Sequence, residues 1–110
     1  GAVMTTESCQ PDDFFVGPDV TTTTGIMASG VNIAKYTPVM IDATAGTFKS
    51  WDGTPGKAVG ITAMAVNASA GQVEFSYYNG GTFRASYLNW SADAVKRKSA
   101  FAGTPVSIQE

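Results

Sequence analysis

Histidine is absent from this chain of 110 residues, and Cys9 is its single cysteine. Histidine is the side chain that most often serves as a general base near neutral pH, and it is the commonest metal ligand. Its absence excludes a Ser-His-Asp triad and, with one cysteine, zinc sites of the usual composition. One thiol cannot form an internal disulfide and no histidine can activate it, so we interpret Cys9 as an incidental residue of a flexible N-terminal arm.

Long apolar runs are also missing. No stretch approaches the ~20 apolar residues of a membrane span, and no basic segment followed by an apolar run marks a signal peptide. We therefore expect no membrane partner. Charged residues make up 15% of the chain, whereas they make up about 25% of an ordinary globular protein. A surface with so few charges favours association with a partner or with further copies of the chain.

The few charges are distributed unevenly. The net charge is −2, whereas a nucleic-acid-binding protein usually carries a basic surface, so we expect no nucleic-acid partner. Residues 1–34 hold four acidic residues and no basic one, and residues 35–110 hold seven basic and five acidic residues. An acidic segment before a mildly basic one predicts two parts with different roles.

The first part, residues 1–36, is predicted to be an extended arm. Prolines and glycines interrupt any helix, and the β-branched run from Thr21 to Thr24 favours extended backbone. Val31 and Ile33 alternate with other residues in a pattern that predicts a short strand. Apolar residues scattered through the segment indicate that it packs on a surface, because a disordered tail would contain fewer of them.

The second part, residues 37–110, is predicted to be a small β-rich domain. Short strands are expected at residues 39–41, 47–51, 58–66, 72–78 and 105–108. The 58–66 segment is apolar on both faces, so we expect it to be the central strand, and the 72–78 segment alternates as a half-buried strand does. Turns are expected at Ala45-Gly46, at Asp52-Gly53, at residues 67–71 and at Asn79-Gly80-Gly81.

One short helix is predicted near the C-terminus, over residues 92–101. Ser91 can cap its first turn, and Asp93 suits the positive N-terminal end of a helix. The basic run at residues 96–98 suits the negative C-terminal end, and we interpret it as a solvated face rather than a nucleic-acid site. The fold class that follows is mainly β, a small single domain with one short helix and an extended N-terminal arm.

Two groups of residues could carry chemistry. Asp42 and Asp52 could form the carboxylate pair of a small hydrolase, but each lies beside a turn, where aspartate commonly bonds to its own backbone. Five aromatic residues could stack on a sugar, although in so small a domain such residues usually form the core. They are Trp51, Tyr77, Tyr78, Tyr87 and Trp90. We assign no catalytic residue, no cofactor and no metal, and predict that the chain is not an enzyme.

Six short pieces occur in a characteristic order over roughly the last two thirds of the chain. They are Thr37-Pro38-Val39-Met40-Ile41-Asp42, Trp51-Asp52-Gly53-Thr54, Ala58-Val59-Gly60-Ile61, Gly81-Thr82-Phe83-Arg84, Leu88-Asn89-Trp90 and Ala100-Phe101-Ala102-Gly103-Thr104. In this order and at this spacing, they resemble the small head decoration proteins of lambda-like tailed phages.

The resemblance implies a β-clip-like fold and a function in binding rather than catalysis. It implies a homotrimer on the outer capsid surface of the virion, made in the host bacterial cytoplasm, that holds subunits of the major capsid protein together. Residues 1–36 would then be the capsid-binding arm and residues 37–110 the decoration domain. Candidate capsid-binding residues are Val20, Thr21, Thr22, Thr23, Thr24 and Ile26, which suit addition as a strand to an edge of the capsid protein. The alternative is a monomeric carbohydrate-binding surface module that uses the aromatic residues.

Overall fold

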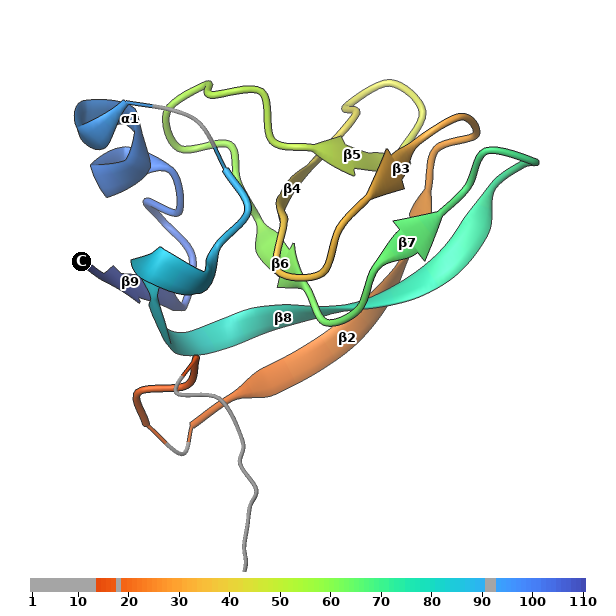
Figure 1. Cartoon of the computed structure of the whole chain (residues 1–110). Helices are drawn as coiled ribbons and strands as arrows, with labels where there is room; N and C mark the ends of the chain where they lie inside the picture. The colour runs from red at the N-terminus through yellow and green to blue at the C-terminus, as the bar shows by residue number, and fades with distance from the viewer. Residues whose placement is uncertain (1–13, 18, 91–92) are drawn as a thin grey trace, which may run out of the picture.

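One long strand, β8 (Val73–Arg84), organises the fold, which is shown in Figure 1. The computed structural model describes residues 14–17, 19–90 and 93–110. Eight strands and two short helices occur in these residues. The other strands are β2 (Thr21–Met27), β3 (Asn32–Ile33), β4 (Pro38–Ile41), β5 (Phe48–Ser50), β6 (Gly60–Thr62), β7 (Val66–Asn67) and β9 (Val106–Gln109), and the helices are η1 (Ala85–Tyr87) and α1 (Ala94–Ser99). The fold is therefore mainly β, as the sequence predicts.

The main sheet closes on itself. Its strand order is β2-β5-β4-β6-β8-β9, and β2 also pairs with β8, so that β2, β5, β4, β6 and β8 form a ring. The antiparallel β2–β8 pairing is the most extensive in the molecule and runs from Thr21↔Gly80 to Met27↔Val73. By contrast, β2 meets β5 in the single parallel pair Met27↔Phe48. The short strands β3 and β7 form a separate antiparallel pair.

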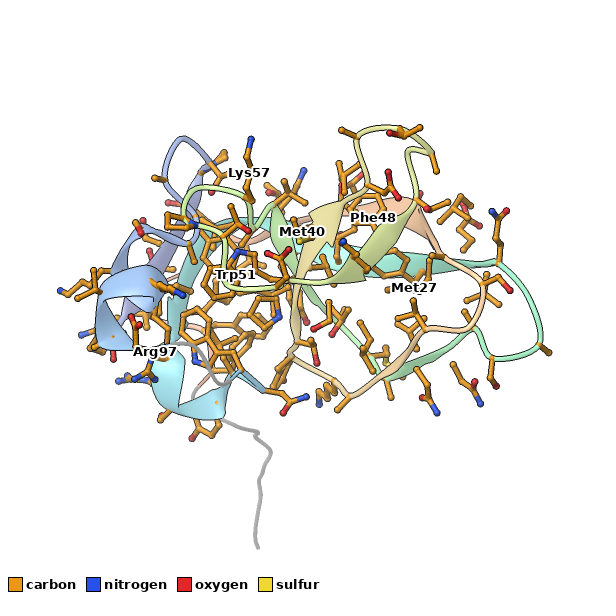
Figure 2. All side chains as sticks on the ribbon, turned by 90° about the horizontal axis from the view of Figure 1, so that it is seen from above. Met27, Met40, Phe48, Trp51, Lys57 and Arg97 are labelled. Carbon is orange, nitrogen blue, oxygen red and sulfur yellow. The ribbon has the colours of Figure 1, made fainter. Side chains whose placement is uncertain are left out.

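Two clusters of apolar side chains fill the interior. One contains Phe14, Tyr36, Trp51 and Phe83 and lies toward α1 and β9; the other contains Met27, Phe48 and Phe75. Figure 2 shows the separation, with Trp51 toward the end that carries Arg97 and Met27 beside Phe48 at the other end.

The described part of the predicted arm belongs to this core. Residues 14–36 contribute β2 and β3, and Phe14 is fully buried with its ring stacked on that of Tyr36 at 3.9 Å between centroids. The apolar side chains of this segment thus pack against the rest of the same chain. Residues 1–13, including Cys9, lie outside the described residues.

The predicted strands at 39–41, 47–51, 72–78 and 105–108 are confirmed, but the expected single strand at 58–66 is wrong. This segment forms β6 and β7, which lie in different sheets and are separated by a bend at Ala63 and Met64. The side chain of Met64 is 69% exposed. Only β6 has the expected central place between β4 and β8, and its three residues are all buried.

The expected turn at Asn79-Gly80-Gly81 is also wrong, because β8 continues through these residues, with a register shift in its pairing with β2 between Thr21 and Thr22. The antiparallel pairing with β2 ends at Gly80, and the parallel pairing with β9 begins at Gly81. A Cβ on Gly80 would lie 2.6 Å from Oγ1 of Thr21, and one on Gly81 would lie 3.2 Å from the carbonyl oxygen of Asp19. The glycines therefore permit the close approach of the chain before β2, and Gly81 adopts a φ of +124° within the strand.

The C-terminal helix is shorter than predicted. It begins after Asp93, whose side-chain Oδ1 accepts a hydrogen bond from the backbone N–H of Lys96 at 2.8 Å. Asp93 is thus the N-cap residue itself, whereas the sequence pattern favoured Ser91, which lies outside the described residues.

Candidate functional site

The chain from Phe14 to Met27 lines one side of β8. The carbonyl oxygen of Phe14 accepts a hydrogen bond from the N–H of Arg84 at 3.0 Å, and the N–H of Val16 donates to the carbonyl oxygen of Thr82 at 3.0 Å. The chain then continues into β2, which pairs with β8 from Gly80 back to Val73. Together, residues 14–16 and β2 form a composite edge of the sheet, which we call the β2 edge.

Over the residues that the structure describes, no strand pairs with the outer side of β2 between Thr21 and Thr24. Among the described residues, the strand pairing of β2 on this side consists of Met27 with Phe48, followed by the hydrogen bond from the N–H of Ala28 to the carbonyl oxygen of Phe48. Because backbone polar groups alternate along a strand, the outward direction at Ala28 implies that Thr24 and Thr22 also direct their N–H and C=O groups outward. Consistently, the carbonyl oxygen of Ser76, the partner of Thr24, faces away from β2 and accepts a hydrogen bond from the N–H of Ala63, which directly follows β6.

The composition of this strand offers no protection against pairing. Residues 20–27 contain no charged residue and no proline, which are the usual devices that keep an exposed edge from recruiting another strand. Thr21 to Thr24 are all exposed, and the side chain of Ile26 is 40% exposed. An uncharged edge strand with free backbone groups is a surface suited to strand addition.

The structure brings the six candidate residues from the sequence analysis together on this edge. Thr21, Thr22, Thr23, Thr24 and Ile26 lie in β2, and Val20 directly precedes it and packs against the first core cluster. What sequence reasoning missed is that one side of this strand is already paired with β8. That pairing joins segments some fifty residues apart, and no local pattern could have revealed it.

Asp42 and Asp52 each accept hydrogen bonds within their own turns. The Oδ1 atom of Asp42 accepts hydrogen bonds from the N–H groups of Thr44 and Ala45 at 2.9 and 3.2 Å. The Oδ1 atom of Asp52 accepts bonds from the hydroxyl and N–H of Thr54 at 2.7 and 3.0 Å. These bonds favour the charged form and hold the pKa of each carboxyl below the ordinary aspartate value. Each carboxylate thus stabilises its own turn, as a turn aspartate is expected to do.

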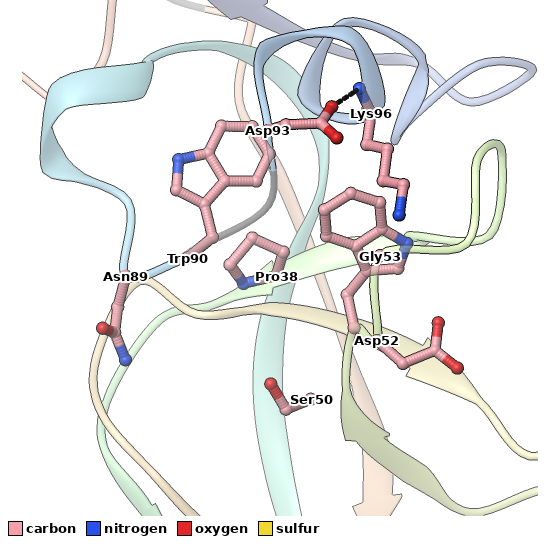
Figure 3. A pocket seen from close by; sticks show the side chains of 9 residues that line it. Pro38, Ser50, Asp52, Gly53, Asn89, Trp90, Asp93 and Lys96 are labelled. Atoms are coloured by element: carbon pink, nitrogen blue, oxygen red, sulfur yellow. Dashed lines mark hydrogen bonds between the residues drawn. The ribbon is translucent and has the colours of Figure 1, made fainter.

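A cleft of about 610 Å³ lies between the β5 end of the sheet and α1. Its lining includes Trp51, Trp90, Asp52 and Lys96, and Figure 3 shows the last three of these side chains. The two indole rings lie 6.0 Å apart at 50°, and the indole N–H of Trp51 donates to the carbonyl oxygen of Thr54. Trp51 is only 8% exposed, so its ring presents little surface on which a sugar could stack.

The remaining aromatic candidates do not complete a sugar-binding face. Tyr77 packs with Phe48 and Phe75 in the second core cluster, whereas Tyr87 lies beside Phe14 at the other end of the molecule. The five aromatic residues therefore divide between separate parts of the core and its margins.

The basic run at the end of α1 is partly used within the chain. The guanidinium of Arg97 lies 5.6 Å from the ring of Trp90, and the side chain of Lys96 passes over the Gly53 loop. In the part of the chain that the structure describes, no group of three potential metal ligands occurs. Within the same residues, no helix combines the length and apolar character needed to cross a membrane.

Comparison with known proteins identifies the family of this chain. A family model described as bacteriophage lambda head decoration protein D matches residues 4–107. The chain belongs to this family. It is 34% identical to a head decoration protein of Enterobacteria phage P21 over 97 residues, which cover 84% of this chain and 83% of that protein. It is also 41% identical, over 76 residues, to a protein of Escherichia phage N15 named as a decoration protein, covering 66% and 67% of the two chains.

Membership of the head decoration family supports a structural role in decorating the phage capsid and assigns the chain to the head of the virion. The family consists of structural capsid proteins, not enzymes, in agreement with the turn roles of Asp42 and Asp52. The match begins at residue 4, so it extends beyond the last two thirds of the chain and includes the whole β2 edge.

Proposed function

We propose that this decoration protein forms a homotrimer on the outer surface of the expanded phage head. There it holds neighbouring subunits of the major capsid protein together against the pressure of packaged DNA, after synthesis in the host bacterial cytoplasm. The observation that carries the proposal is the β2 edge, which exposes outward backbone groups at Thr22 and Thr24 and carries no protecting charge between residues 20 and 27.

The proposed contact is strand addition. An extended segment of the capsid protein pairs with the outer side of β2, so that main-chain hydrogen bonds supply affinity without requiring particular side chains on β2. The residues concerned are Val20, Thr21, Thr22, Thr23, Thr24 and Ile26. A trimer presents three such edges, and simultaneous attachment multiplies weak single contacts into stable binding.

Residues 1–13 complete the capsid-binding arm in this proposal. They carry three of the four acidic residues that precede Lys35, namely Glu7, Asp12 and Asp13. Phe14, the described residue that follows them, is fully buried at the start of the β2 edge.

The first test measures native mass in solution and then co-sedimentation with expanded and unexpanded empty shells of the same phage. We expect a trimer that pellets with expanded shells only. A monomer that pellets with neither shell would refute the proposal.

A pair of substitutions at one position separates backbone pairing from side-chain contact. Thr24→Pro removes the outward N–H of β2, whereas Thr24→Ala removes the side chain and keeps that N–H. Because the N–H of Thr24 does not face β8, both variants should retain the β2–β8 pairing, which circular dichroism and native mass can check. We expect Thr24→Ala to pellet with expanded shells like the unmodified protein and Thr24→Pro to stay in the supernatant. Equal binding by both variants would exclude strand addition at this position.

A further inference from the structure

Three exposed apolar residues gather at the start of the β2 edge. The side chains of Phe15, Val16 and Tyr87 are 40%, 39% and 40% exposed. The rings of Phe15 and Tyr87 both lie next to the ring of the buried Phe14, at centroid distances of 5.3 and 6.2 Å. We call these three residues the Phe15 patch.

The patch is built on a rigid base. Phe14 is fully buried between the rings of Tyr36 and Phe83, at centroid distances of 3.9 and 4.9 Å. Phe15 forms a β-bridge with Phe83, and its ring packs edge-on against that of Tyr78 at 5.3 Å. The exposed rings are thus held in place by the core and by the backbone of β8, so that binding would order few additional side chains.

The patch and the open strand lie along the same side of β8. Val16 bonds to Thr82, and Thr22 pairs with Tyr78, so the two positions are four β8 residues apart. At a rise of about 3.3 Å per residue, this separation is about 13 Å. A strand that pairs with the outward groups of Thr22 and Thr24 and continues in the same direction would reach the patch within about four residues.

We propose that the Phe15 patch receives an aliphatic or aromatic side chain of the capsid-protein segment that pairs with β2. In strand addition, the backbone bonds provide affinity, and a site for a side chain fixes the register and the choice of partner. The four identical threonines of β2 cannot by themselves fix the register of the added strand. The patch provides one apolar contact at a defined distance from them. This inference rests on the proposed strand addition and names the partner chemistry that the strand requires.

The test uses the full chain and expanded empty shells of the same phage. Phe15→Gln and Tyr87→Gln replace an exposed apolar ring with a polar side chain, and Met64→Gln is the matched control at a 69% exposed position in the β6–β7 connection. Val16→Thr is nearly isosteric and is matched by Val95→Thr, at a 79% exposed position on α1. Native mass and thermal unfolding establish that each variant folds and assembles like the unmodified protein.

We expect the patch variants at Phe15 and Tyr87 to require at least about tenfold more protein for half-saturation of the shells, because each loses the burial of a large ring. Val16→Thr should show a smaller loss, and both controls should bind like the unmodified protein.

Normal binding by all three patch variants, with the unmodified protein bound, would overturn this inference while leaving strand addition intact. Loss of the trimer in the patch variants would also overturn it, because the patch would then lie between copies of this chain. If the unmodified protein itself does not bind the expanded shells, both the proposed function and this inference are refuted.

Discussion

Phe14→Ala removes a ring that is completely enclosed, although the residue belongs to a segment that the sequence suggests is an arm. The side chain of Phe14 is 0% exposed and contacts the rings of Tyr36 and Phe83. Truncation of a buried phenylalanine to alanine costs about 3–5 kcal/mol of unfolding free energy, and the lost ring pairs place this site toward the upper part of that range. A domain of this size is stable by only about 5–15 kcal/mol, so the variant should be close to unfolding at physiological temperature.

The assay is urea denaturation followed by tryptophan fluorescence, with thermal unfolding as a second measurement. For a domain of about 100 residues, 1 kcal/mol corresponds to a shift of about 4 °C in the melting temperature, so a loss of ~4 kcal/mol predicts a decrease of about 16 °C. Protein concentration must be held constant, because trimer assembly would add a concentration-dependent term to the measured stability.

Phe15→Ala is the matched control, since it removes the same side chain from the adjacent, 40% exposed position. We expect it to cost only about 1 kcal/mol, in line with its partial burial. A Phe14→Ala variant that loses no more stability than Phe15→Ala would refute the assignment of Phe14 to the core. Residues before β2 would then be separable from the domain.

Three further predictions concern local structure. Gly81→Ala should lower the unfolding free energy by about 2 kcal/mol or more, because φ is +124° and the new Cβ would meet the backbone of the chain before β2. The control Gly56→Ala, at φ +73° with nothing within 4 Å of the new Cβ, should cost only about 1 kcal/mol when both are measured by urea denaturation. Hydrogen bonds from the N–H of Thr44 and from the hydroxyl of Thr54 lower the folded-state pKa values of Asp42 and Asp52, respectively. The stability that these bonds contribute is present above the unfolded aspartate pKa of about 3.9 and is lost as the pH falls through the lower folded-state values. The double variant Asp42→Asn, Asp52→Asn should therefore show a smaller decline in unfolding free energy below about pH 4 than the unmodified protein. Asp93→Ala should cost about 1 kcal/mol through loss of the N-cap, and unchanged unfolding would contradict the capping role.

Local signals in the sequence were sufficient for most short elements. Alternation predicted the half-buried first part of β8, and β9 and β4 lie where apolar runs are flanked by turn residues. These elements depend on neighbouring residues in the chain, which is the information that a pattern contains.

The failures share a physical cause, which is pairing between distant segments. The apolar run at 58–66 has strand character throughout, but the fold needs its two ends in different sheets, so the chain bends at Ala63 and Met64. Asn79-Gly80-Gly81 has the composition of a turn, yet its glycines serve the close approach of Asp19 and Thr21. Five of the six candidate capsid-binding residues lie in β2, and Val20 directly precedes it, but their position at an edge depends on β8. The Phe15 patch depends in the same way on Phe83 and Tyr36.

The alternating direction of backbone groups along β2 has a consequence for amide hydrogen exchange. The N–H groups of Thr23 and Gly25 face β8 and should exchange slowly, whereas those of Thr22 and Thr24 face solvent and should exchange at rates close to those of an unfolded peptide. The free protein would therefore show a two-residue alternation of fast and slow sites within one strand. Attachment of a second strand would slow amide exchange only at Thr22 and Thr24. The slow amides of Thr23 and Gly25 would stay unchanged and serve as an internal reference.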